Sequence, residues 1–379
     1  REPGKVVVRE RVAGDTGLTP QQIAETHTDA VVFFEAGWKI VDTDSGRQLN
    51  QVYLPNRQKD KSGQITPIVP GAGESLPVFV ALADGSYEPM LTTDDGEGAY
   101  RAVGGRHSGS GFIVSSDGFI LTNRHVAAAW HTYYSFPPED QAGLLLIFDS
   151  GMKVTNQRII SRDQFPSWVP AEAKFVIEGS FRQGSVRVMR QSVSGKAIEG
   201  RNDYLDVTLA KNRVRIPASL ARVSDRIDVA MVKIDLPRSL NKLELNDNYD
   251  TAKPGEPAIV MGYPGISPAV VGVTSSKDAL NPGQQAKVIP DPTISVGNIG
   301  RIIRGRSGLE EGIFSSVGDL YQLTVNTAGP GNSGGPVFDN HGKVIAIYTS
   351  GRSTQGATVS FAVPIRYGME LMGTAKVMD

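Results

Sequence analysis

Short apolar segments rich in valine and isoleucine recur along the whole chain, and glycine, proline or another turn residue separates most of them. Examples are GFIVSS (111–116), VAMVKID (229–235) and KVIAIYTS (343–350). Runs of this length and composition predict β-strands. Many short strands with frequent turn residues are typical of an all-β sandwich or barrel, so we expect an all-β protein.

Helix signals are few. Thr19 followed by Pro20 and Gln22 has the pattern of a capping residue, a first-turn proline and a capping box, which predicts a short helix over 20–28. A second helix is expected after Pro364, in IRYGMELM. A β-hairpin is predicted where PVF and KVIAIY flank the turn 339–342.

Three regions resemble insertions in this framework of strands: about 44–104, about 137–203 and 274–290. Loops of this length are uncommon unless they fold or function. Within the second region, VRVM (186–189) and AKFVIEG (173–179) predict strands of its own. We expect the third region to be a mobile loop.

Composition excludes several classes of protein. The 39 Lys and Arg balance 40 Asp and Glu, which argues against nucleic acid or an anionic membrane as the main partner. No apolar run reaches the roughly 18 residues of a membrane-spanning helix. The absence of cysteine excludes disulfides, thiol catalysis and cysteine metal sites, and is compatible with the cytosol or the periplasm.

One serine, Ser333, lies in the glycine-rich segment GNSGG (331–335) just before an apolar run. A G-x-S-x-G pattern by itself is weak evidence, because glycine and serine are common turn residues. In an α/β-hydrolase the acid and then the histidine would follow the serine. Here only His341 follows, inside a hairpin turn, and alternation of strands and helices is missing. We therefore exclude that fold.

A serine nucleophile needs a base, and the base needs an acid to orient it. His125 follows two predicted strands that flank the turn 115–118, so it is suited to face a cleft. Asp228 directly precedes the apolar strand 229–234, where a partly buried carboxylate would need a partner such as an imidazole N–H. Asp225 and Asp206 are rival candidates. His107 is expected at the surface.

Three segments together resemble the trypsin-like serine proteases of the HtrA/Deg type. They are SGSGFIVSSDGFILTNRHV (108–126), DRIDVAMVKID (225–235) and GPGNSGGPVFDNHGKVIAI (329–347). Four further segments resemble the same family: DAVVFFEAG (29–37), AIVMGYPG (258–265), TISVGNIGRII (293–303) and VSFAVPI (359–365). Together these blocks cover about half of the chain, in the family's order, but the three insertions have no counterpart in the family. The chain ends soon after the last predicted helix, so we expect no PDZ domain within it; whether one was trimmed stays open.

The resemblance implies a His-Asp-Ser triad that hydrolyses peptide bonds through an acyl-enzyme. His125 would be the general base and acid, Asp228 the orienting carboxylate and Ser333 the nucleophile. The backbone N–H groups of Gly331 and Ser333 would form the oxyanion hole. No metal or organic cofactor is required by this chemistry.

Substrate preference is inferred from the loop before the nucleophile. This loop, which includes Thr327 and Ala328, holds no Asp or Glu, so the pocket should accept small or medium apolar side chains of unfolded protein. An extended substrate is expected to pair with the edge near Thr349 and Ser350. The alternative function is a latent or non-enzymatic protease-fold chaperone or scaffold.

The predicted fold is therefore a pair of antiparallel six-stranded β-barrels of the chymotrypsin type, with long insertions and few short helices. The first barrel is expected over 29–240 and the second over 250–365, after an N-terminal segment 1–28 and before a C-terminal helix and tail, 366–379. A polypeptide is the expected partner. The resemblance suggests a periplasmic or exported setting without excluding the cytoplasm, and it leaves homo-oligomer formation open.

Overall fold

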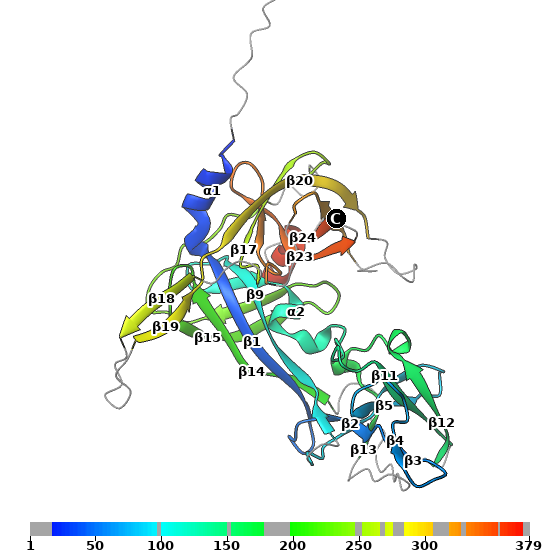
Figure 1. Cartoon of the computed structure of the whole chain (residues 1–379). Coiled ribbons are helices and arrows are strands. Elements are labelled where there is room, and N and C mark those ends of the chain that lie inside the picture. Colours follow the sequence, from blue (N-terminus) through cyan, green and yellow to red (C-terminus); the bar gives the residue numbers. More distant parts are fainter. Residues whose placement is uncertain are drawn as a thin grey trace, which may run out of the picture.

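The computed structural model describes ten stretches of the chain: residues 17–96, 100–149, 153–177, 198–246, 252–265, 270–275, 284–305, 318–326, 331–354 and 357–373. Strands dominate these residues, and two groups of six antiparallel strands each close into a barrel. Figure 1 shows the barrels packed against each other, with a further sheet at one end of the first barrel. The predicted fold class, two six-stranded barrels with few short helices, is confirmed.

The first barrel closes in the order β1-β14-β15-β16-β10-β9. Every neighbouring pair in it is antiparallel. Its strands are β1 (Val31–Asp42), β9 (Gly104–Ile113), β10 (Phe119–Thr122), β14 (Ile198–Leu209), β15 (Arg215–Val223) and β16 (Ala230–Ile234). The second predicted insertion, 137–203, thus overlaps the first residues of β14.

The second barrel closes in the order β17-β20-β21-β24-β23-β22. Its strands are β17 (Pro257–Gly262), β20 (Thr293–Ile303), β21 (Leu320–Leu323), β22 (Pro336–Phe338), β23 (Val344–Thr354) and β24 (Ala357–Pro364). The predicted hairpin around 339–342 joins β22 to β23 and is confirmed. One apolar cluster, which includes Leu121, Met261 and Phe338, holds the two barrels together.

The helical elements are short. They are α1 (Pro20–His27), η1 (Thr28–Ala30), α2 (Arg124–Ala127), η2 (Ala129–His131), η3 (Arg162–Gln164), η4 (Pro170–Glu172) and α3 (Ile365–Met372). Both predicted helices are confirmed as α1 and α3. At the start of α1 the capping box forms as predicted: the Gln22 N–H donates to Thr19 Oγ1 over 3.2 Å, and the Thr19 N–H donates to Gln22 Oε1 over 2.9 Å. None of the described helices is long and apolar enough to cross a membrane.

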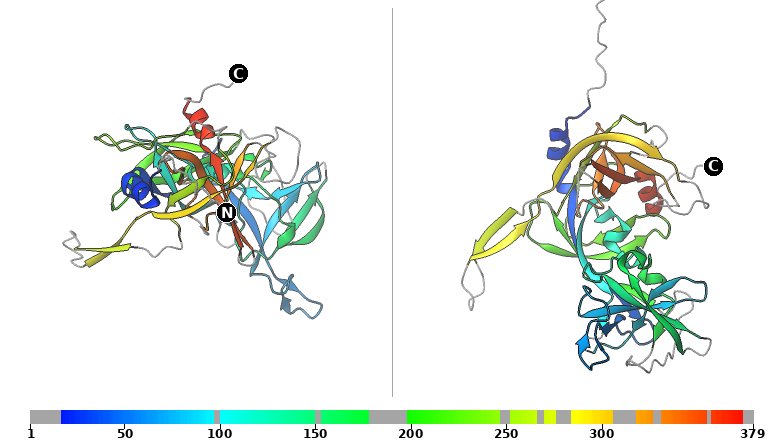
Figure 2. Two further views of the ribbon diagram at one scale, coloured as in Figure 1. Left: turned by 90° about the horizontal axis from the view of Figure 1, so that it is seen from above. Right: turned by 45° about the vertical axis from the view of Figure 1, so that its right-hand side comes forward.

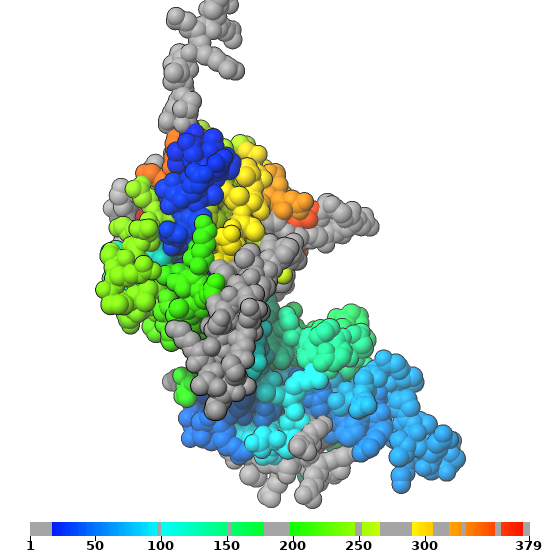
Figure 3. Space-filling model, turned by 60° about the vertical axis from the view of Figure 1, so that its left-hand side comes forward, coloured from blue at the N-terminus to red at the C-terminus, as the bar shows by residue number. Residues whose placement is uncertain are grey.

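The first two insertions combine into one mixed sheet of eight strands. The first insertion gives β2 (Asn50–Pro55), β5 (Ser75–Ala81), β6 (Tyr87–Pro89), β7 (Leu91–Thr92) and β8 (Tyr100–Ala102), and the second gives β11 (Ala142–Phe148), β12 (Val154–Ser161) and β13 (Val176–Ile177). The two insertions meet through the parallel pairs β11–β5 and β13–β7. Figure 3 shows this sheet as a lobe of its own below the barrels.

Of the two strands predicted inside the second insertion, the one in 173–179 is present as β13, and 186–189 lies outside the described residues. The lobe meets the first barrel through an aromatic cluster that contains Trp38, Trp130 and Phe136. A separate cluster, with Val52 and Phe175, lies elsewhere in the lobe. The barrel and the lobe therefore share a continuous apolar junction.

Two antiparallel ribbons stand apart from these sheets: β3 (Gln58–Lys59) with β4 (Ile65–Thr66), and β18 (Val270–Ser275) with β19 (Gln284–Ile289). The second ribbon projects from the barrels in both views of Figure 2. The third predicted insertion, 274–290, is therefore not a loop in its described part, because residues 284–289 pair with residues 270–275. Residues 276–283 lie outside the described part.

Candidate active site

His125 lies in the first turn after a barrel hairpin. β9 and β10 pair with Phe112 opposite Leu121, and α2 begins two residues after β10 ends. The intervening residue, Asn123, donates from Nδ2 to the backbone carbonyl of Asp228 over 2.8 Å. This bond fixes the start of α2 against the segment that leads into β16. The His125 side chain keeps a third of its surface exposed, at 34%.

Asp228 receives two hydrogen bonds from His125. Its Oδ2 lies 2.8 Å from His125 Nδ1, and its Oδ1 accepts from the His125 backbone N–H over 3.0 Å. The rival carboxylates lie elsewhere: Asp225 is 93% exposed, and Asp206 pairs with Arg215 over 2.9 Å. Of the three candidates, the structure brings Asp228 to the histidine.

Burial and charge act in opposite directions on this pair. Burial disfavours the charged forms of both groups, yet the Asp228 carboxylate outweighs it and raises the pKa of His125 above 6.5. Burial likewise opposes ionisation of Asp228, but the charge and hydrogen bonds of His125, with a hydroxyl from Thr349, lower its pKa to about 2. The carboxylate therefore stays ionised through the neutral range and holds the imidazole by Nδ1, leaving Nε2 for proton transfer.

Ser333 lies in the turn before β22, and its backbone is tied to both barrels. Its carbonyl accepts from the Ser110 N–H over 2.7 Å, and the next N–H, of Gly334, donates to Tyr348 over 2.8 Å. The Ser333 hydroxyl donates to the backbone carbonyl of Thr349 over 2.8 Å. Among the described residues the Ser333 hydroxyl forms no hydrogen bond with His125.

Thr349 contacts both halves of the site because of a bulge. In β23, Tyr348 pairs with Ala362 and Ser350 with Phe361, which leaves Thr349 as the extra residue. A bulge redirects the side chain at that position. The Thr349 hydroxyl donates to Asp228 Oδ2 over 2.6 Å, while its carbonyl accepts from Ser333.

Two glycines in the serine turn have positive φ angles, +111° at Gly331 and +89° at Gly334. A Cβ atom at Gly334 would lie 2.1 Å from the Ser110 carbonyl oxygen, and one at Gly331 would lie 2.2 Å from the Tyr263 carbonyl oxygen. Both positions therefore require glycine for conformation and for the close approach of neighbouring backbones. Within the described residues, the N–H groups of Gly331 and Ser333 have no backbone acceptor, as an oxyanion hole requires.

The comparison with known families agrees with this geometry. The family model described as the trypsin-like peptidase domain matches residues 109–347, which is more than half of the chain and includes His125, Asp228 and Ser333. The chain belongs to the trypsin-like peptidase domain family.

Relatives of this peptidase domain are named as serine proteases. Serine protease HTRA1A of Danio rerio is 31% identical over 184 residues, which cover 45% of this chain and 32% of the relative. The putative serine protease HhoB of Synechocystis sp. is 31% identical over 260 residues, 68% of this chain and 38% of the relative. The resemblance inferred from the sequence is thus confirmed, and the chain spans about a third of the length of these relatives.

Solved structures similar to the peptidase domain include the HtrA-type protease AlgW with a decapeptide. A serine-to-alanine form of that protease has 18% sequence identity and a TM-score of 0.47, and the match covers 94% of this chain and 66% of that one. The form without that substitution has the same identity and a TM-score of 0.44, with 94% and 67% covered.

The residues predicted to bind substrate in the peptidase domain have different outcomes. Thr327 and Ala328 lie outside the described residues. Thr349 directs its hydroxyl at Asp228 rather than at the solvent, so its side chain serves the carboxylate. Ser350 is exposed on β23, and its role in binding substrate stays a prediction.

His107 was expected at the surface, and this expectation is wrong. Its ring is partly buried, and its Nε2 lies 2.9 Å from the carbonyl oxygen of Val126, the residue after His125. Burial lowers the pKa of His107, and the nearby His125 lowers it further. The hydrogen bond to the Val126 carbonyl acts in the opposite direction and raises the pKa, but its effect is smaller. The side chain therefore packs against the turn that carries the predicted base.

Ser110 is a site residue that the sequence reasoning missed. It lies in β9 of the first barrel and is fully buried. Its hydroxyl donates to the Gly331 carbonyl over 2.6 Å and accepts from the Tyr263 N–H over 3.0 Å, so it joins the serine turn to both barrels. The only signal in the sequence was a small polar residue inside the apolar strand SGSGFIV.

Proposed function

We propose that the chain is a serine endopeptidase that cleaves peptide bonds through an acyl-enzyme. One observation carries the proposal: Asp228, His125 and Ser333 meet around one bulged residue, Thr349, which bonds to both the carboxylate and the nucleophile. The histidine thus has an ionised partner on Nδ1, and backbone hydrogen bonds tie the turn of the proposed nucleophile to both barrels. The chain retains the residue types of all three proposed triad members and of the proposed oxyanion glycine, which favours an enzyme over the non-enzymatic scaffold.

The reaction follows from these positions. The Ser333 hydroxyl leaves the Thr349 carbonyl and gives its proton to His125 Nε2 as Oγ forms a bond to the substrate carbonyl carbon. The N–H groups of Gly331 and Ser333 stabilise the oxyanion that forms. His125 then gives the proton to the leaving amine, the C–N bond breaks, and a water activated in the same way hydrolyses the acyl-enzyme.

The proposed substrates are unfolded polypeptides cleaved after small or medium apolar residues. The support is the sequence of the loop 327–330, which lacks an acidic residue that would select lysine or arginine. Libraries of short peptides with varied residues before the scissile bond test this preference. Faster cleavage after lysine or arginine than after alanine or valine would contradict it.

The setting and assembly proposed with this activity rest on the resemblance alone. We propose a periplasmic or exported enzyme, which cell fractionation tests. Light scattering of the purified chain tests homo-oligomer formation.

The decisive experiment is labelling of the full chain with a fluorophosphonate, read by intact mass, beside His125→Ala and Ser333→Ala. We expect one adduct on wild-type protein, located at Ser333, and none on either variant. The His125→Ala variant is the sharper control because it keeps the serine and its turn. Absence of an adduct on folded wild-type protein would overturn the proposal.

A further inference from the structure

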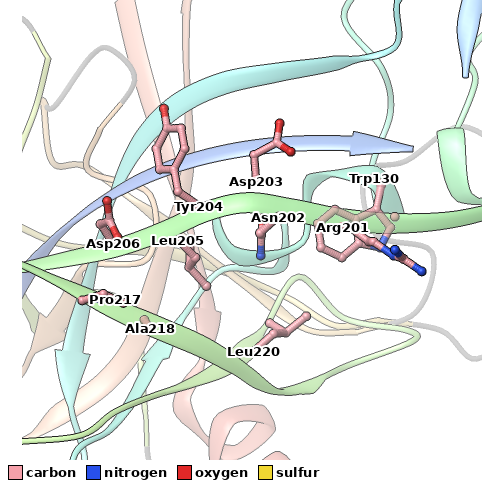
Figure 4. Close-up of a pocket in the computed structure, with 11 residues that line it drawn as sticks. Trp130, Arg201, Asn202, Asp203, Tyr204, Leu205, Asp206, Pro217, Ala218 and Leu220 are labelled. Atoms are coloured by element: carbon pink, nitrogen blue, oxygen red, sulfur yellow. The ribbon is translucent and has the colours of Figure 1, made fainter. Parts of the chain in front are cut away.

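A groove lies between β14 and β15, in the wall of the first barrel, with a volume of about 650 Å³. Figure 4 shows the two strands diverging from a common end, with Trp130 behind the open side. The residues proposed for catalysis are not among those that line it. The groove is therefore distinct from the catalytic site.

The strands separate for reasons visible in the pairing. β14 and β15 pair only from Asp206 to Thr208, opposite Pro217 to Arg215. Pairing stops at Pro217, which has no N–H to donate. Each strand also contains a bulge on its far side: Asp203 has no partner in β1, and Ala221 has none in β16. Bulges bend and twist strands, and here they keep the groove open.

Backbone groups line both walls of the groove. In the described part of the chain, residues 198–205 pair only with β1, and residues 218–223 pair only with β16. Along each strand, alternate residues direct their N–H and C=O groups to opposite sides. Each strand thus offers the groove a free edge of the kind that accepts another strand.

The groove is lined by both neutral and charged side chains. Asn202, Leu205 and Leu220 point into it in Figure 4. The charges at its rim are paired with one another or with neighbouring residues: Asp203 with Lys39 over 2.6 Å, Asp206 with Arg215 over 2.9 Å, and Arg201 with Glu199 over 2.7 Å. An uncharged ligand with apolar side chains matches this lining.

We propose that the groove binds a short, extended, uncharged segment of a partner polypeptide, which adds as a strand between β14 and β15. Main-chain hydrogen bonds would supply affinity, and contacts with Leu205 and Leu220 would select an apolar side chain. Neighbouring strands lie about 4.8 Å apart, so a strand that pairs with both edges needs them to be separated by about twice that spacing.

The floor of the groove touches the element that carries His125, and this points to a regulatory partner. Asn202 Nδ2 donates to the carbonyl of Ala127, in α2, over 2.9 Å. Trp130, in η2, packs so closely on Gly200 that a Cβ there would lie 1.9 Å from its ring. An occupant that moves Asn202 or Trp130 therefore acts on α2. This regulatory effect rests on the proposed function, whereas binding to the groove does not.

Binding is tested with the full chain carrying Ser333→Ala, which lacks the proposed nucleophile and therefore cannot be acylated by the probe or cleave it. The probe is a fluorescein-labelled hexapeptide of alternating threonine and valine, followed by fluorescence anisotropy. A second probe has the same side chains but N-methyl groups on alternate amides, which removes pairing along one edge of the added strand. We expect saturable binding of the first probe and at least about tenfold weaker binding of the second.

Variants locate the binding site. Leu220→Arg should weaken binding of the first probe by about tenfold, because a charge then occupies the groove. Val214→Arg is the matched control: it adds the same charge at a residue that is 62% exposed in the turn before β15, and should change nothing. If Leu220→Arg does not fold, the two probes on the unaltered groove still decide the question.

Several results would overturn the proposal. Equal binding of both probes, or no saturable binding, would exclude strand addition. Loss of binding after a fluorophosphonate blocks the wild-type chain would place the probe in the catalytic cleft. If the probe slows degradation of a denatured protein without affecting a short ester, the groove holds substrate and the partner assignment is wrong. Failure of the ester assay with binding intact would instead contradict the proposed function.

Discussion

Thr349 is the residue on which the two halves of the site depend, because its hydroxyl holds Asp228 and its carbonyl holds Ser333. Thr349→Val removes the hydrogen bond to a charged group while keeping shape and backbone. A bond of this kind contributes about 1.5–3 kcal/mol, so we expect kcat/KM to fall by roughly ten- to a hundredfold. The measurement is cleavage of a short ester by Thr349→Val and Thr349→Ser. The serine variant should recover most of the rate; equal losses in both would argue against this role.

The charge state of His125 predicts a pH profile. A base whose pKa is raised stays protonated, and so inactive, to higher pH, which places the acid limb of kcat/KM above pH 6.5. In Asp228→Asn the raising cause is lost and burial remains, so the limb should move to lower pH. The rate should fall by roughly 10⁴-fold, as in other triads. A limb that does not move between wild type and Asp228→Asn would contradict the pairing of the two groups.

At the scale of elements, the serine turn is held in place by close contacts with both barrels. In Gly334→Ala, the alanine would have to adopt the positive φ of this position, and its Cβ atom would lie 2.1 Å from the Ser110 carbonyl oxygen. We expect a loss of at least about 3 kcal/mol in the free energy of unfolding, together with loss of fluorophosphonate labelling. Denaturant titration measures the first effect and intact mass the second.

Gly85→Ala is the matched control for that substitution. Gly85 has a φ of +84°, and an added Cβ meets nothing within 4 Å. Only the conformational cost remains, about 1–2 kcal/mol, and labelling of Ser333 should be unchanged. If the two variants lost equal stability, the close approach of β9 to the serine turn would not be the reason for glycine at 334.

At the scale of the whole molecule, the inserted lobe and the first barrel should unfold together. Phe136 is buried in the aromatic cluster between them, and all three tryptophans of the chain (Trp38, Trp130 and Trp168) belong to that cluster. Phe136→Ala should cost about 3–5 kcal/mol. Tryptophan fluorescence and loss of labelling at Ser333 should report one transition, at a lower denaturant concentration than in wild type.

Phe148→Ala, in the other cluster of the lobe, is the comparison. Phe148 is partly buried and contacts Phe175 away from the barrel, so its loss should be smaller. Two separate transitions in wild type, with fluorescence changing before labelling is lost, would show that the lobe folds independently of the barrel.

The sequence by itself determined the features that depend on neighbouring residues. Alternating short strands, the capping box at Thr19 and the hairpin around 339–342 are local patterns, and all three are present in the structure. The few histidines limited the choice of base, and the resemblance of three segments to the HtrA/Deg proteases led to the predicted triad of His125, Asp228 and Ser333. The residues alone left other aspartates open as the acid.

The tertiary structure alone decided what depends on pairing between distant segments. The two insertions form one sheet because β11 pairs with β5, from the other insertion. Thr349 faces Asp228 because of a bulge that no local pattern marks, and Ser110 joins the Gly331 carbonyl from the other barrel. Register, bulges and contacts between barrels are set by packing of the whole molecule, whereas strand and turn signals are set by the residues themselves.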